Sequence, residues 1–268
     1  MQISVLICIC FFLHSFRLTL SHNAQFFQKN SSYFVQRVEI RTVPTPIKIV
    51  HYFTNLDASQ HYWKWGVCMP PTIISGAITA EQFLFYEMRI TARLYQSEMT
   101  LEQAIVEITA QNLFQYPTER ETARMVRACY KRLDALGDDM LRQALLDAPT
   151  EDAKQINLYA MMCQNLLVWK FMVEVIGEKY RTQDDSFSTA DVGGFLSRLQ
   201  SQNDQAAGWS PTTITKIRQV LTRCLVEAGY LDSVRSIQLN PMQAPWVLGQ
   251  GILRNHDAEA LIAFGCTT

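Results

Sequence analysis

This chain of 268 residues lacks the residue patterns that most catalytic and metal sites require. Beyond residue 68 its only histidine is His256, which disfavours histidine-dependent acid–base or nucleophilic catalysis. No paired HxxxH or CxxC spacing, Walker loop or GxGxxG stretch occurs, so neither a zinc site nor a phosphate-binding loop is indicated. We therefore predict a non-enzymatic protein with no catalytic residues, no cofactor and no metal site. Four later cysteines are expected to be small core residues rather than nucleophiles: Cys129, Cys163, Cys224 and Cys266.

The sequence also lacks an excess of positive charge. It has 24 Lys and Arg against 25 Asp and Glu, a formal net charge of −1. Residues 1–68 hold six of these cations and two of the acids, which leaves 18 cations, 23 acids and a net charge of −5 for residues 69–268. Any contact with nucleic acid must therefore use local cationic patches on an acidic body. The apolar content of 48% and charged content of 18% are typical of a globular protein.

Long hydrophobic runs are absent as well. The N-terminal run from Val5 to Leu13 suits a signal-peptide core but is too short to span a membrane. A positive flank and a clear cleavage site are missing, and residues 22–68 show neither helical nor strand periodicity. We interpret residues 1–68 as lying upstream of a true start at Met69, or as disordered, with secretion as the alternative. We expect no membrane contact and a cytoplasmic location.

What the sequence does contain, from Thr79 onward, is a series of helices with start signals. A hydroxyl residue precedes an acid or glutamine by three positions at four places, which is the capping-box pattern. The longest apolar helix is expected over 153–181, in the centre of a core. These features predict an all-α fold, a compact helical bundle whose domains cover 69–182 and 183–268. The segment 234–248 fits either a small β wing or an irregular tail. The four boxes begin at Thr79, Thr100, Thr118 and Ser188.

The helices that follow Thr100 and Thr118 are joined by the short stretch NLFQYP and form the first predicted helix-turn-helix unit. Cations on the second of them recur at steps of four, three and four, which places them on one exposed ridge. Such a ridge is suited to the phosphate backbone of a duplex. The alternative is a solvated face paired with Glu119, Glu121 and Asp134. The ridge consists of Arg120, Arg124, Arg127 and Lys131, flanked by Arg132.

The second predicted unit centres on the stretch from Trp209 to Asp232. Ser210 is a suitable N-cap, Pro211 fits the first helical position, and Gly229 is expected to end the helix. One face is apolar, and the other carries donors that could contact phosphates and base edges, as a recognition helix does. An ordinary surface helix has the same pattern. The polar face comprises Thr212, Thr213, Lys216, Gln219 and Arg223.

Several long stretches resemble the BrxA family, small core proteins of bacterial BREX phage-defence systems. They cover about residues 72–268, in order, and include LFYEMRITARL, NLFQYPTERETARMVRACYKRLDAL, AKQINLYAMMCQNLLVWKFMVEVIGEKYR, WSPTTITKIRQVLTRCLVEAGYLD and LIAFGC. The resemblance implies a helical fold with helix-turn-helix units and binding to double-stranded DNA. It also implies work beside other BREX proteins, namely a methyltransferase, ATPases and a phosphatase-like protein. The cationic ridge and the polar face are assigned as DNA contacts from spacing, since no family motif marks them. The alternatives are a protein–protein scaffold of the same system and an RNA-binding helical protein.

Overall fold

The computed structural model describes residues 33–40, 47–54 and 74–266. The chain divides into two units, Met1–Tyr62 and Trp63–Thr268. In the first, strand β1 (Tyr33–Ile40) pairs antiparallel with β2 (Ile47–Thr54). The sequence analysis predicted no strand here. Both strands are rich in β-branched and aromatic residues, which favour extended backbone even without strict alternation.

The other predictions for residues 1–68, including the start at Met69 and the signal-peptide alternative, lie outside the described residues.

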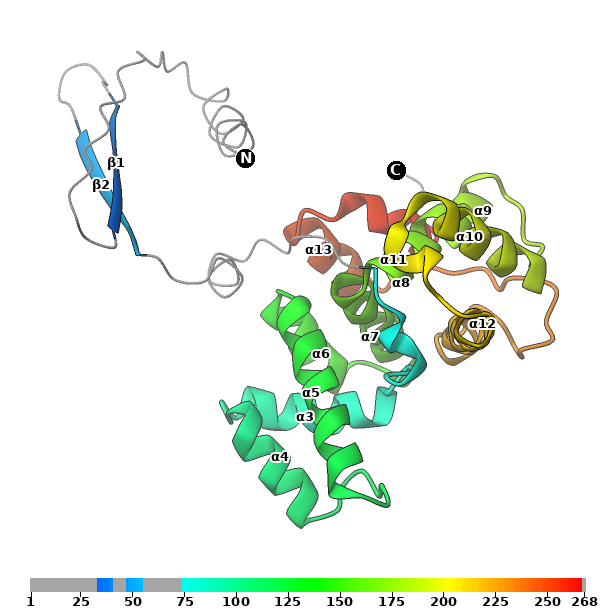
Figure 1. The fold of residues 1–268 in the computed structure, drawn as a ribbon, viewed down its shortest axis with the longest axis horizontal. Helices are drawn as coiled ribbons and strands as arrows, with labels where there is room; N and C mark the ends of the chain where they lie inside the picture. The colour runs from blue at the N-terminus through cyan, green and yellow to red at the C-terminus, as the bar shows by residue number, and fades with distance from the viewer. Residues whose placement is uncertain (1–32, 41–46, 55–73, 267–268) are drawn as a thin grey trace. The chain divides into compact units, whose positions relative to one another are not determined.

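Residues 74–266 of the second unit fold as helices, which confirms the predicted all-α class (Figure 1). The division of this unit at residue 182 stays a prediction. In chain order its elements are the 3-10 turn η2 (Gly76–Thr79), α3 (Phe85–Gln96), α4 (Leu101–Ala110), α5 (Glu119–Ala135), α6 (Asp139–Asp147), α7 (Thr150–Gln164), α8 (Leu166–Phe171), the π-helical turn η3 (Met172–Gly177), α9 (Glu178–Arg181), α10 (Thr189–Gln202), α11 (Asp204–Ala207), α12 (Pro211–Glu227), α13 (Trp246–Arg254) and η4 (Ala258–Phe264).

Three of the four predicted capping boxes mark real helix starts. Thr100 and Gln103 make both bonds of a capping box before α4. The hydroxyl of Thr118 accepts from the N–H of Glu121 before α5, and the carboxylate of Asp191 accepts from the N–H of Ser188 before α10. These side chains satisfy first-turn groups that the helix itself leaves unpaired.

The predicted box at Thr79 is wrong. Helix α3 begins only at Phe85, after Leu84 adopts a left-handed backbone with φ of 52°. The carbonyl of Phe83 accepts from the side chains of Arg132 and Asn157, each at 2.8 Å. Because these long-range donors hold the preceding segment in a non-helical path, local capping cannot start the helix there.

The predicted long helix over 153–181 is interrupted. Helix α7 ends at Gln164, and the segment from Leu166 to Arg181 is bent from it by 115°. At the corner, the side chain of Asn165 accepts from the N–H of Leu167 at 3.0 Å and donates to the carbonyl of Ser75 at 3.2 Å. Asn165 thus provides a cap inside the apolar run, a signal that hydrophobic periodicity masks.

No single helix among the described residues is long and apolar enough to cross a membrane. Helix α7 and the Leu166–Arg181 segment are long and apolar enough only when they are taken together, and the two are bent by 115° where they meet.

The buried side chains form two clusters. The larger one is built around α7, α8, α10 and α12. The smaller one lies between α4 and α5, which therefore form a hairpin with a core of its own. It contains Ala104, Ile108, Phe114, Met125, Val126 and Tyr130.

The segment between α12 and α13 resolves the choice between a β wing and an irregular tail. Residues 232–245 contain no strand; a single bridge joins Gln238 to Ser186. Leu239 also donates its N–H to Asp185 at 2.7 Å. The segment is therefore an irregular tail held against the linker before α10, and the β wing considered for 234–248 does not form.

Candidate nucleic-acid interface

In the predicted first helix-turn-helix unit, α5 packs against α4 and also against α3 and α7, and leaves one strip of its surface exposed. The small core of the α4–α5 hairpin fixes α5 against α4, and the hydroxyl of Tyr130 donates to the carbonyl of Met99 at 2.9 Å just before α4. The connecting loop bends through two left-handed residues, Asn112 and Gln115. Figure 1 shows α4 and α5 together with α3, whereas α12 lies beside α10 and α11.

The four ridge cations of α5 are all exposed. The alternative, in which neighbouring carboxylates pair with these cations, is observed only in part. Arg124 lies 3.6 Å from Glu121, and both side chains are well exposed, so this ion pair is weak. Asp134 accepts instead from the hydroxyl of Tyr95 at 2.7 Å. In the part of the chain that the structure describes, the other three cations have no ion pair: Arg120, Arg127 and Lys131.

Arg132, predicted to flank the ridge, is not on it. Its residue is 1% exposed, and its guanidinium donates to the carbonyls of Phe83, Glu81 and Gln82. Burial lowers the pKa of this guanidinium, although arginine stays protonated at physiological pH. Arg132 follows Lys131 directly, and one helical step of 100° turns it from solvent into the core. We therefore remove Arg132 from the set of candidate DNA contacts.

Helix α12 matches its predicted boundaries. The hydroxyl of Ser210 accepts from the N–H of Thr213 at 3.2 Å, Pro211 occupies the first turn, and Gly229 has φ of 84° after the last turn. Ile217 and Leu221 on the inner face are buried. The apolar face predicted from the sequence is therefore the face that α12 buries.

The polar face of α12 is mostly free to bind. Thr213 is half-buried, and its hydroxyl lies 2.9 Å from that of Ser210, so it serves the cap. The Nη1 of Arg223 donates to Gln82 Oε1 at 3.4 Å, a long bond between exposed groups. The exposed members of the face are Thr212, Lys216, Gln219 and Arg223.

A groove of about 650 Å³ borders this face between α12, the start of α10 and the tail at Val234. It adds Arg218, which the sequence analysis missed. Arg218 was placed neither on the predicted apolar face nor on the polar face, and it is half-buried between the two. Its long side chain nevertheless reaches the groove, as arginine side chains do when their stems pack on apolar surface.

The cysteines belong to the core. Cys129, Cys163 and Cys224 are buried, and Cys266 is partly buried. Burial raises the pKa of the Cys129 and Cys224 thiols to about 12, which keeps them protonated and unreactive. Within residues 74–266, no three His, Cys, Asp or Glu side chains are placed to hold a metal ion.

Comparison with known proteins places this fold in a family. The family model described as BrxA matches residues 74–248. A "BREX protein BrxA" of Bacillus cereus (strain H3081.97) is 30% identical over 161 residues, which covers 60% of this chain and 80% of that protein. A "BREX protein BrxA" of Escherichia coli O9:H4 (strain HS) is 23% identical over 190 residues, or 70% of this chain and 87% of that one.

A solved structure has the same fold. The crystal structure of an uncharacterized protein from Magnetospirillum magneticum matches with a TM-score of 0.63 at 19% identity, over 71% of this chain and 97% of that chain. The family model covers most of the helical unit and includes both α5 and α12. This chain belongs to the BrxA family.

Proposed function

We propose that this protein is a non-catalytic, double-stranded-DNA-binding component of a BREX-type phage-defence system. The observation that carries the proposal is the ridge of Arg120, Arg124, Arg127 and Lys131. Four exposed cations follow one side of α5, and only one of them has a carboxylate partner among the described residues. On a unit with a net charge of −5 for residues 69–268, such a concentration of free cations is a local patch suited to phosphates.

The two helices would contribute differently. The ridge cations would bind backbone phosphates and fix the position of the duplex without regard to sequence. Thr212, Lys216 and Gln219 on α12 would approach a groove, where amide and ammonium groups can bond base edges. Arg218 and Arg223 lie beside them and would contact the adjoining backbone. The α4–α5 hairpin and α12 with α10 are, in this proposal, the two helix-turn-helix units.

Membership of the BrxA family supports other BREX proteins as partners, and the particular partners named next are part of the proposal. As part of a BREX system the protein would act in the cytoplasm beside a methyltransferase, ATPases and a phosphatase-like protein. The competing function is a scaffold role in the same system, in which the cations of α5 and α12 bind acidic surfaces of partner proteins instead of DNA.

A competition experiment tests the proposal. A fluorescent 30-base-pair duplex is bound to the protein at low salt and displaced with unlabelled duplex DNA, structured RNA or heparin. We expect duplex DNA to displace the probe at lower nucleotide concentration than RNA. Failure to bind the duplex would leave the scaffold function, and preference for structured RNA would replace DNA with RNA as the ligand.

A further inference from the structure

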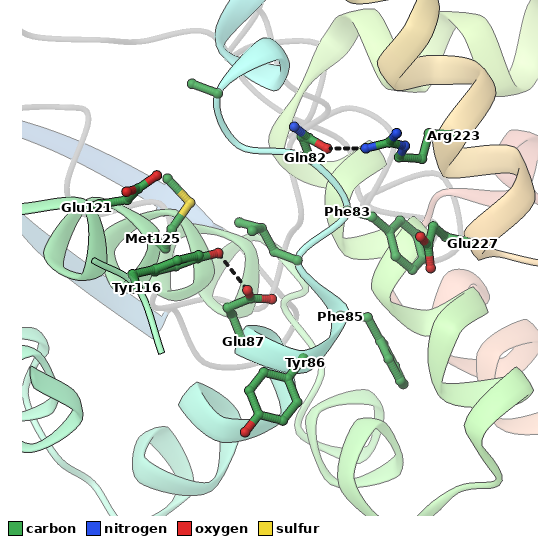
Figure 2. A pocket seen from close by; sticks show the side chains of 12 residues that line it. Gln82, Phe83, Phe85, Tyr86, Glu87, Tyr116, Glu121, Met125, Arg223 and Glu227 are labelled. Carbon is green, nitrogen blue, oxygen red and sulfur yellow. Dashed lines mark hydrogen bonds between the residues drawn. The ribbon is translucent and has the colours of Figure 1, made fainter. Parts of the chain in front are cut away.

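A second groove, shown in Figure 2, lies between α5 and α12. Its volume is about 500 Å³, within the range of ligand-binding pockets. The segment Ala80–Glu87 runs through it, Tyr116 and Met125 border it on the α5 side, and Glu227 borders it on α12. Of the proposed DNA contacts, Arg223 alone lines this groove.

The walls of this groove are aromatic. Phe83 is buried, Phe85 and Tyr116 are half-buried, and Tyr86 is 57% exposed. Figure 2 shows the Phe85 and Tyr86 side chains on the α3 side and Tyr116 on the α5 side, with the Tyr116 hydroxyl directed at Glu87. The faces of such rings carry partial negative charge and attract cations, and the guanidinium of Arg89 already lies over the Phe85 ring, 5.9 Å from its centroid.

Carboxylates complete the lining. Glu87 accepts from the hydroxyl of Tyr116 at 2.6 Å, which fixes it beside the rings. Burial and this carboxylate raise the pKa of Tyr116, so its hydroxyl stays a donor. Glu227 makes no hydrogen bond or ion pair with any residue that the structure describes, and Glu121 has only its weak pair with Arg124. With Arg223 as the single cation in the lining, the groove is negatively charged and repels nucleic acid.

The floor of the groove is held in place from behind. Buried Arg132 donates to the carbonyls of Glu81, Gln82 and Phe83, and buried Asn157 donates to Phe83 as well. Leu84 then takes a left-handed backbone that a leucine adopts only when its surroundings impose it. Buried polar groups thus fix the shape of a surface segment, which is the preorganisation that a binding site needs.

We propose that this groove docks an extended segment of a partner protein that carries a lysine or arginine next to an apolar side chain. The aliphatic stem and the apolar neighbour would cover the rings, and the charged head would reach Glu87 and Glu227. A phosphate-bearing ligand is excluded by the carboxylates. A metal ion is disfavoured because no three ligating side chains converge among the described residues. The carboxylates proposed to bind the charged head, Glu87 and Glu227, are not among the proposed DNA contacts, although the groove borders Arg223 and, through Glu121, the ridge residue Arg124.

Display selection with random peptides tests this proposal. Peptides of 12 residues are selected against the immobilised full chain, and the enriched peptides are measured by fluorescence anisotropy. We expect enrichment of peptides with a lysine or arginine beside an apolar residue. The double variant Glu87→Gln/Glu227→Gln should bind them at least about tenfold more weakly, because close charge pairs at partly desolvated sites contribute strongly to affinity.

The variant Glu102→Gln is the matched control. It removes one exposed carboxylate at the start of α4, outside the groove, and should bind the peptides like the unmodified chain. Glutamine at position 87 can still accept from Tyr116, so the fold is preserved. The proposal is overturned by a selection without enrichment, by enriched peptides that lack cations, or by equal binding to the double variant. Duplex DNA binding should persist in the double variant, so failure here is distinguishable from failure of the DNA-binding proposal.

Discussion

Helices α5 and α12 are alike in construction and different in surface chemistry. Each has 17 residues, begins after a hydroxyl residue that caps its first turn, and buries one face. The exposed side of α5 carries four cations, whereas that of α12 mixes two cations with Thr212 and Gln219. Uniform charge gives affinity for any duplex, and mixed donors and acceptors can distinguish base pairs. In the proposed function, α5 therefore positions the duplex and α12 discriminates between base sequences.

The same comparison holds within α5, between neighbouring cations. Lys131 is exposed, and Arg132 is 1% exposed with three backbone carbonyls as partners. The two residues have the same sign of charge and adjacent positions, yet one is available to a ligand and the other stabilises the fold. A charged residue on a helix therefore indicates a binding function only when it is known whether its side chain points to solvent or into the core.

The largest expected effect comes from Arg132→Met. The substitution keeps an unbranched side chain and removes the donors to the part-buried carbonyls of Glu81 and Gln82 and one of the two donors to the buried carbonyl of Phe83, which keeps its bond from Asn157. We expect the free energy of unfolding to fall by about 3 kcal/mol, measured by urea denaturation. The control Arg127→Met, at an exposed position of the same helix, should change it by less than about 0.5 kcal/mol. Equal effects of the two variants would refute the structural role of Arg132.

The second effect concerns the ridge. Arg124→Glu with Arg127→Glu should weaken binding to any duplex by about 30-fold or more at low salt, because two phosphate contacts become repulsive. The loss should be the same for unrelated sequences, measured by anisotropy. The control Arg93→Glu with Arg181→Glu makes the same change of net charge on α3 and α9, at residues that belong to neither proposed DNA-binding face. If this control loses as much affinity, net charge and not the ridge determines binding.

The smallest effect concerns Gln219 on α12. Gln219→Ala should reduce the preference for the best-bound sequence over random DNA by about tenfold, the contribution of one bidentate base contact. Affinity for random DNA should barely change, because a neutral amide neutralises no phosphate and therefore releases no counterion. Gln243→Ala, an exposed glutamine in the tail after α12, is the control. An equal loss of affinity for the best-bound sequence and for random DNA would show that α12 positions the duplex and does not read its sequence.

Local signals predicted most of the fold. The capping residues Thr100, Thr118, Ser188 and Ser210 and the terminal Gly229 marked helix ends correctly, because caps and left-handed glycines act within a few residues. The failures have two kinds of cause: the break at Asn165 comes from a local cap that the apolar run masks, and the late start of α3 has a non-local cause. The start after Thr79 was overridden by donors that are distant in sequence.

The candidate site was predictable to a similar degree. Spacing identified the exposed cations of α5 and the polar face of α12, since a helix of known register has a known outer side. It could not identify Arg218, which is half-buried between the apolar and polar faces of α12. Nor could it predict the groove of Figure 2, because Glu87, Tyr116 and Glu227 come together only through tertiary packing.

A salt titration of duplex binding tests the central claim most directly. With the four ridge cations and with Arg218 and Arg223 of α12 on phosphates, the logarithm of the association constant should fall linearly with the logarithm of salt concentration, with a slope of about −5. The ridge variant Arg124→Glu/Arg127→Glu should flatten this slope by about 2. A slope near zero for the unmodified protein, or the same slope for both proteins, would contradict the account.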